Sequence, residues 1–473
     1  MIDQLPTYNH QLRKWMLVFV FTPSFIFPLA TLFIAARNKS IFQGRLSFST
    51  PTLTIVLWML IIIAAALFFL KRQKLFQENL QGLILLLLFI VGYYLLARIF
   101  NRFDINTNNV YFEADNWSWL RRMALEDGRD LGIRAVHPFS YILFRPLVAT
   151  MSLFTSGNPY EANISVLSLA GGGCVFLMWK IVKQISSDEV NAILFASLLG
   201  LSSSHLIFAG VIETYIFSAL CLLFSVWLLI NNKSIYLLAA ADITTFGITI
   251  SNIVQQGITT LLVLGNLKRT TILFAFVISI SIGLNILSKS IYPSNEYVFI
   301  PGNLSGEREF QKEVTLKRAV LMAENLFVYN ITAPEPYTSI RNEMPRFNFL
   351  NGTINQYAWF GWPSLIFWLG TLILAFFYFL KDIRLNTSNA HLAAAMFVCL
   401  LFNYVLHIGY GVEPFLYSPD WTYALVLFVA ITLGGTAKQN WFKIPLFLLV
   451  LSIFVNNMWI LYLIAGKVSK YLG

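Results

Sequence analysis

Residues 80–99 read LQGLILLLLFIVGYYLLARI, an apolar run in which Arg98 is the one charged side chain. A helix needs about 20 such residues to cross the hydrocarbon core of a bilayer. The run lacks the alternation of a barrel strand, so an α-helix is the structure that satisfies its backbone in lipid. Residues 80–99 therefore predict a transmembrane helix.

Apolar runs of this kind recur along the whole chain. We expect spans at residues 16–36, 51–70, 80–99, 161–183, 190–209, 214–231, 235–251, 253–267, 270–288, 358–380, 389–410, 417–435 and 443–465. Of the 473 residues, 57% are hydrophobic and 12% charged, whereas a soluble domain has about 25% charged residues. The sequence predicts an all-α polytopic membrane protein with about thirteen transmembrane helices, and a lipid bilayer as its surroundings.

Lysine and arginine set the orientation of these spans. With the N-terminus inside, most short inner turns carry cations, such as Lys71, Lys183, Lys233, Lys268 and Lys381. The formal charge of +10 therefore indicates inner helix ends and lipid headgroups rather than a nucleic-acid partner.

This topology divides the chain into five parts and leaves two long polar segments on the outer side. The parts are residues 1–99 (N-terminal helices), 100–160 (outer loop), 161–288 (central bundle), 289–357 (outer loop) and 358–473 (C-terminal helices). The first outer loop contains an amphipathic stretch, His137 to Leu153, that predicts a helix lying in the interface, with a spanning segment as the alternative.

The first outer loop also carries the strongest candidate for chemistry. Glu113 and Asp115 stand two residues apart and are followed by Trp117, Trp119, Arg121 and Arg122. Two such carboxylates can accept a proton from a hydroxyl or hold a divalent metal. An ordinary solvated loop with an aromatic anchor is the alternative.

Other ionisable residues fall at the same outer boundary. His137 opens the interfacial stretch and can contact an anionic substrate or tune a carboxylate, while Arg145 can do the same or reach lipid headgroups. Glu213, in Glu213-Thr-Tyr215, lies between apolar residues, where a charge is costly and marks a functional candidate. A carboxylate in the first turn of a helix is its structural alternative.

Two further outer segments supply candidates. The loop 289–357 contains Arg318, Arg341 and Arg346, the side chains suited to bidentate phosphate contact, although most charges of such a loop form a solvated face. A third outer turn, from His407 to Trp421, carries His407, Glu413 and Asp420. It can complete a sugar pocket or simply cap helices.

The order of these features resembles the polytopic GT-C glycosyltransferases. An outer Glu-x-Asp, an interfacial His-Pro helix, two spans and then Glu-Thr-Tyr opening the next span carry the resemblance, over about residues 105–231. That superfamily includes protein O-mannosyltransferases, lipid A aminoarabinose transferases and O-antigen glucosyltransferases. About three helices precede the acidic loop here, whereas the family usually has one.

The resemblance implies an enzyme that moves a sugar from a polyprenyl-phosphate donor to a glycan, lipid or protein acceptor at the outer membrane face. Asp115 is then the general base of an inverting transfer and Glu113 a metal or substrate ligand. A divalent cation, Mg²⁺ or Mn²⁺, would assist departure of the phosphate, but many members work without a tightly bound metal. The expected substrate-binding residues are Arg121, Arg122, His137, Arg145, Glu213, Tyr215, Arg318, Arg341, Arg346, His407, Glu413 and Asp420.

Two other interpretations of the sequence stay open. An O-antigen-type polymerase or ligase also has many helices and an arginine-rich outer loop, but does not need the Glu-x-Asp pair. A transporter of lipid-linked sugars predicts charges inside the spans, of which Asp242 is the clearest. Because the acidic groups gather on one face and the outer loops lack cysteine, we expect an enzyme of a bacterial inner membrane with a periplasmic active site.

Overall fold

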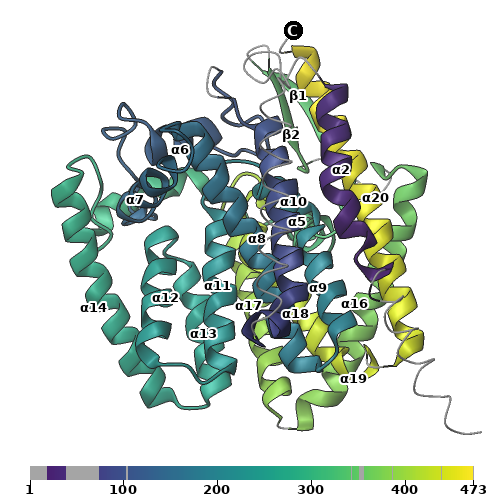
Figure 1. The fold of residues 1–473 in the computed structure, drawn as a ribbon. Coiled ribbons are helices and arrows are strands. Elements are labelled where there is room, and N and C mark those ends of the chain that lie inside the picture. The colour runs from purple at the N-terminus through teal and green to yellow at the C-terminus, as the bar shows by residue number, and fades with distance from the viewer. Residues whose placement is uncertain are drawn as a thin grey trace, which may run out of the picture.

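The computed structural model describes residues 17, 19–38, 74–102, 105–341, 344–350, 356–385, 387–437 and 439–471. These residues are mostly helical (Figure 1). Six of the described helices are long and apolar enough to cross a membrane. They are α5 (Lys74–Phe100), α8 (Pro159–Ser186), α14 (Leu267–Ile291), α16 (Trp362–Asp382), α17 (Ser388–Ile408) and α20 (Asn440–Tyr471). The chain thus has the helices of a multi-pass membrane protein.

Shorter apolar helices fill most of the other predicted spans. They are α2 (Thr22–Arg37), α9 (Glu189–Gly200), α11 (Tyr215–Ile230), α12 (Ile235–Ile248), α13 (Asn252–Leu264) and α18 (Pro419–Thr432). At about 1.5 Å per residue, α12 and α13 are about 20 Å long, less than the roughly 30 Å of a bilayer core. The predicted span 51–70 lies outside the described residues. The total of thirteen spans stays a prediction.

The predicted single span 190–209 is wrong. Helix α9 ends at Gly200, and a new short helix, α10 (Ser203–Phe208), begins after Ser202. Ser202 is the N-cap, and its hydroxyl accepts a hydrogen bond from the His205 amide. The amides of Ser203 and Ser204 donate to backbone carbonyls of residues 331 and 330, both at 3.1 Å. The serine run therefore breaks the helix.

Helix packing places α5 and α8 in the middle of the bundle. Helix α5 packs against α2 and α8, and α8 also packs against α9 and α11. On the other side, α17 packs against α13 and α18, and α16 against α18 and α20. A Cβ atom on Gly171 of α8 would lie 2.7 Å from the Tyr93 ring of α5, so glycine is what lets these two helices approach.

Loops and turns divide the bundle into two ends, which lie at the top and bottom of Figure 1. The loop end carries residues 100–102, 105–158, 209–214, 292–341, 344–350, 356–361 and 409–418. The turn end carries residues 187–188, 231–234, 265–266, 383–385, 387, 433–437 and 439. Lysines predicted to face inward gather at the turn end, where Lys183 lies 3.6 Å from Glu189 and Lys443 lies 2.7 Å from Asp188.

The loop end contains the only strands of the described residues and several short helices. The strands β1 (Tyr337–Arg341) and β2 (Met344–Asn348) form an antiparallel hairpin, which the all-α prediction did not include. The helices are α6 (Asn116–Ala124), α7 (Ser140–Ser152), the 3₁₀ helix η1 (Pro301–Phe310) and α15 (Leu316–Glu324). Helix α7 confirms a helix within the amphipathic stretch 137–153. Helices α6 and α7 lie above α11 and α12 in Figure 1.

Candidate active site

A cavity of about 350 Å³ opens at the loop end. Four stretches that are far apart in the sequence line it, at residues 109–137, 213–215, 309–310 and 412–417. Seven of the residues predicted from the sequence lie in its wall: Glu113, Asp115, Arg122, His137, Glu213, Tyr215 and Glu413. The fold therefore brings the first and third outer segments together around one space.

Glu213 and Asp115 are joined directly, although they are 98 positions apart in the sequence. The backbone amide of Asp115 donates to Glu213 Oε1 at 2.8 Å, and the Thr214 amide donates to Oε2 at 3.0 Å. Burial raises the pKa of Glu213 to about 8, and the neighbouring Asp115 charge adds to this. Glu213 is therefore mostly protonated at neutral pH, and it holds the acidic loop without adding a second charge.

Asn101, at the end of α5, fixes both partners of this contact. Its Oδ1 accepts from the Ile212 amide at 3.0 Å and from the Asn116 side chain at 3.3 Å. Its Nδ2 donates to the Gly210 carbonyl at 2.7 Å. Because Ile212 precedes Glu213 and Asn116 follows Asp115, one amide side chain sets the position of both carboxyl groups.

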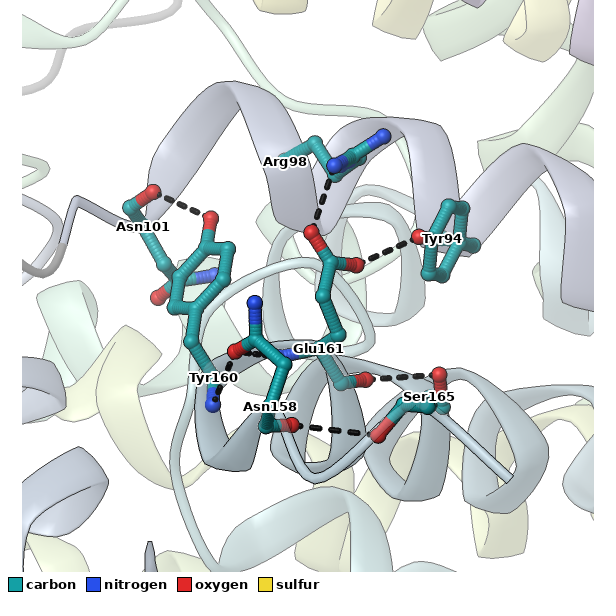
Figure 2. A network of polar contacts seen from close by, with 8 residues as sticks. Tyr94, Arg98, Asn101, Asn158, Tyr160, Glu161 and Ser165 are labelled. Atoms are coloured by element: carbon teal, nitrogen blue, oxygen red, sulfur yellow. Dashed lines mark hydrogen bonds and ion pairs between the residues drawn. The ribbon is translucent and has the colours of Figure 1, made fainter. Parts of the chain in front are cut away.

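A polar network anchors Asn101 to the start of α8 (Figure 2). Tyr160 donates its hydroxyl to the Asn101 carbonyl at 2.7 Å. The next residue, Glu161, binds Arg98 and the Tyr94 hydroxyl on α5. Two consecutive residues of α8 thus hold the last turns of α5, from which the acidic loop departs.

The acidic loop has an unusual backbone. Asn109, Phe112 and Glu113 have positive φ angles of 62°, 53° and 60°, a region that non-glycine residues rarely occupy. Tertiary contacts impose this shape: the Phe112 amide donates to the Phe347 carbonyl of β2 at 3.0 Å, and the buried Phe112 ring packs against Phe415. Strained backbone of this kind concentrates at functional sites.

The surroundings of the two loop carboxylates shift their pKa values in the same direction. Burial raises the pKa of Asp115, and Arg122 and Arg134 oppose that shift. Burial likewise raises the pKa of Glu113, opposed by Arg346, whose Nη1 lies 4.0 Å from Glu113 Oε1. Each carboxylate therefore has cations nearby and is more basic than a solvated one.

His137 enters the cavity as a neutral imidazole. Its Nδ1 lies 2.6 Å from the Ile248 carbonyl, which can only accept, so the proton is assigned to Nδ1. Burial lowers its pKa to about 3, and Arg134 acts in the same direction. Nε2 is consequently a hydrogen-bond acceptor, and the ring stands edge-on to Trp119 at 5.4 Å.

Aromatic rings and one further cation form another part of the wall. The rings of Tyr215 and Tyr417 lie 5.3 Å apart. Arg134 lies over the Phe310 ring at 4.7 Å and pairs with Glu307 at 3.2 Å. Aromatic faces next to cations suit a ligand with a sugar ring and a phosphate.

The third outer turn is held by Arg318. Its guanidinium donates to the carbonyls of His407, Tyr410, Gly411 and Val412, at 2.6–3.2 Å. These donors are therefore committed to backbone. The turn leads into Glu413, which accepts from the amides of residues 349 and 415 and whose pKa burial raises to about 7.

The structure places the remaining predicted residues outside the cavity wall. Arg121 pairs with Asp127 at 3.1 Å. Arg145 donates to the carbonyls of residues 122 and 125, which end α6. His407 is buried and stacks on Tyr417 at 4.4 Å. The others are Arg341 at the exposed end of β1, Arg346 beside Glu113, Arg318 in the third turn and Asp420, which is buried in α18.

Sequence reasoning missed several residues of the wall. Arg134 stands three residues before His137 on the same loop, so its position next to a predicted site residue was a usable signal. Trp119 is named in the first outer loop without a role at a site, and Tyr417 lies within the third outer turn, between the predicted residues Glu413 and Asp420. Asn109, Glu309 and Phe310 had no signal in the sequence, because only the tertiary fold brings them to the cavity.

The carboxylates of the cavity decide whether the predicted divalent cation can bind there. Within the described part of the chain, no three His, Cys, Asp or Glu side chains are grouped to hold a metal ion. Of the five carboxylates of the wall, Glu213 and Glu413 have both oxygens bonded to amides, which leaves Glu309 and the loop pair, Glu113 and Asp115. Such a pair fits Mg²⁺ in the manner of sites that share the ion with a substrate phosphate.

Comparison of the chain with known protein-family models and with curated proteins finds no match. The residues of the site themselves therefore carry the functional argument.

Proposed function

We propose that the chain is an integral-membrane glycosyltransferase, which moves a sugar from a polyprenyl-phosphate donor to an acceptor hydroxyl. The observation that carries this proposal is the meeting of Glu113 and Asp115 with Arg122 and Arg134 around one cavity at the loop end. Transfer from a phosphate-linked sugar needs a base for the acceptor and positive charge for the leaving group.

Asp115 acts as the general base. The acceptor hydroxyl gives its proton to the Asp115 carboxylate while its oxygen bonds to the anomeric carbon, and the bond from that carbon to the phosphate oxygen breaks. The product is inverted at the anomeric carbon, and polyprenyl phosphate leaves with the bonding electrons. Burial supports this role, since a raised pKa makes Asp115 a better proton acceptor near neutral pH.

The donor phosphate binds toward Arg122 and Arg134. Both guanidinium groups border the cavity beside Asp115, and arginine is suited to phosphate oxygens. Trp119, Tyr215 and Tyr417 offer aromatic faces to the sugar. His137 Nε2 accepts a hydrogen bond from a sugar hydroxyl, and Glu113 binds a further hydroxyl or a cation.

A divalent cation, Mg²⁺ or Mn²⁺, would be held by Glu113 together with the donor phosphate and would neutralise charge on the leaving group. Arg122 and Arg134 supply positive charge from the chain itself.

The membrane arrangement follows from the two ends of the bundle. The loop end faces outward, to the periplasm of a bacterial inner membrane, and the cationic turn end faces the cytoplasm. About thirteen spans complete the GT-C-like arrangement. The donor's prenyl chain stays in the bilayer, while the acceptor, a glycan, a lipid or a protein, approaches from outside.

A transfer assay in nanodiscs tests this proposal. Labelled polyprenyl-phosphate glucose, mannose and aminoarabinose are offered with membrane-derived acceptors, and we expect the wild type to transfer at least one sugar. Absence of transfer and of donor binding for all three would count against it. If Glu113→Gln/Asp115→Asn polymerised or ligated glycan at the normal rate, the polymerase or ligase reading would replace it.

A further inference from the structure

A second cavity lies at the turn end, far from the acidic loop. It is a groove of about 410 Å³ between the starts of α12 and α14, which pack against each other. Apart from Asn266, Lys268 and Arg269, its walls are apolar or aromatic side chains: Ile235, Tyr236, Ala239, Ile272, Leu273 and Phe276. Helices α12 and α14 lie on the left side of the bundle in Figure 1.

The apolar part of the groove continues along the outer face of α14. Ile272 is 61% exposed and Phe276 48% exposed. Helix α14 is apolar enough to cross a membrane, yet little of it is buried by the protein. In a bilayer these side chains therefore contact acyl chains.

The charge of the groove is one-sided. Lys268 and Arg269 stand in the first turn of α14, and no carboxylate lines the groove. The positive end of the helix dipole adds to the same potential. Another groove at the turn end, separate from the α12–α14 groove, has a carboxylate in its wall, because Asp382 lines it next to Lys381.

Two other cations of the turn end are paired with carboxylates. Lys183 lies 3.6 Å from Glu189, and Lys443 lies 2.7 Å from Asp188. The α12–α14 groove thus combines an apolar wall with positive charge that its own lining does not balance. That combination is complementary to an anionic lipid: a phosphate at the helix start and an acyl chain along the helix.

We propose that the α12–α14 groove is a binding site for an anionic phospholipid of the leaflet at the turn end. The headgroup phosphate contacts Lys268 and Arg269, and one acyl chain follows Ile272 and Phe276. The site is separate from the transfer cavity, and the inference does not rest on the proposed enzymatic function.

Native mass spectrometry of the full chain, released from nanodiscs of equal phosphatidylglycerol and phosphatidylcholine, tests this site. We expect the wild type to retain phosphatidylglycerol over phosphatidylcholine by about 30-fold, from two cations near the membrane surface. Lys268→Gln/Arg269→Gln should bring the ratio close to one. The matched control Lys381→Gln, in the carboxylate-balanced groove, should keep the wild-type ratio.

Three results would overturn the proposal. They are equal retention of the two lipids by the wild type, an unchanged ratio in the double variant, and displacement of phosphatidylglycerol by excess inorganic phosphate. The last would identify a site for free anions instead of lipid. The single variant Arg269→Gln should give a lipid ratio between those of the wild type and the double variant. It therefore tests the proposal even if the double variant does not fold.

Discussion

Glu213 shows how one buried carboxyl group organises the site. It is almost fully buried and holds the amide of Asp115. Burial disfavours the ionised form of Glu213, and repulsion by the Asp115 charge adds to this effect, so the environment favours the protonated form. Asp115 then carries the negative charge of this pair alone, which suits the general-base role proposed for it.

This protonation has a consequence for stability against pH. Below about pH 4.5 the Glu213 carboxyl is protonated in both the folded and the unfolded chain, and it contributes no pH dependence. Between pH 4.5 and about 8 the unfolded chain ionises this group while the folded chain keeps it protonated. Stability is therefore lost as the pH rises through this window, and the loss levels off above it.

Glu213→Gln removes this titration. We expect the melting temperature of the wild type to fall, relative to that of Glu213→Gln, as the pH rises from about 5 to about 8. Thermal unfolding of both proteins in the same detergent across this range measures the difference. A difference between the two melting temperatures that stays constant across this pH range would show that Glu213 ionises normally in the folded chain.

For single residues, the sequence was informative about the carboxylates of the site and less so about its arginines. Glu213 was a candidate because an acidic side chain between apolar residues is costly without a function. Glu113 and Asp115 were candidates because they form a pair two residues apart, followed by cations. The partners of Arg145 and Arg318 were not, because backbone carbonyls accept their hydrogen bonds and a sequence does not reveal which carbonyls a fold presents.

Among the elements, the third outer turn depends on one glycine. Gly411 has a φ angle of +86°, and a Cβ atom there would lie 2.4 Å from the Tyr417 ring. Gly409, two residues earlier, has a φ angle of −105°, and its added Cβ would meet only Val314, at 3.8 Å.

Gly411→Ala should therefore destabilise the protein by about 2 kcal/mol and lower sugar transfer, since Tyr417 lines the cavity. Gly409→Ala is the matched control, and we expect it to keep both properties near the wild-type values. Thermal unfolding and transfer rates measure the pair. Equal effects of the two substitutions would refute this account of the turn.

The Asn101 side chain joins the end of α5 to the segment before Glu213 and to Asn116 of α6. Because it does not line the cavity itself, its loss should affect catalysis more than binding. Asn101→Ala leaves the buried Ile212 amide without its partner, at a cost of about 1–3 kcal/mol, and frees Glu213 and Asp115 to shift. We expect kcat to fall about tenfold or more with KM within about twofold.

Asn231→Ala is the control for this prediction, because Asn231 bonds Gln184 and the Trp227 carbonyl at the turn end. It should leave both kinetic parameters unchanged. A rise in KM alone for Asn101→Ala would assign Asn101 to substrate binding instead of positioning.

Helices were predictable where the apolar composition of a segment decides its structure. Runs such as 80–99 and 161–183 became α5 and α8, because lipid leaves the backbone no alternative to a helix. The break after Gly200 and the hairpin of β1 and β2 were not predicted. Both depend on distant backbone, at residues 330–331 and at the Tyr111–Phe347 bridge.

For the whole molecule, the central structural expectation is that the two ends face opposite sides of a membrane. Single cysteines introduced after removal of Cys174, Cys221 and Cys399 test it in intact cells. Ser305→Cys at the loop end should react with a membrane-impermeant maleimide from outside. Asn389→Cys at the turn end should react only after lysis. Both positions are exposed. The reverse labelling pattern would therefore show that the turn end, and not the loop end, faces outward.

The measurement that tests the functional account most directly is single-turnover sugar transfer in nanodiscs, for the wild type, Asp115→Asn and Asp127→Asn. Asp127 is the matched control, since it lies on the same loop, is largely exposed and pairs with Arg121. We predict a loss of about 100-fold or more for Asp115→Asn, donor binding within a few-fold of wild type, and normal transfer by Asp127→Asn. Normal transfer by Asp115→Asn would contradict the assignment of Asp115 as the base.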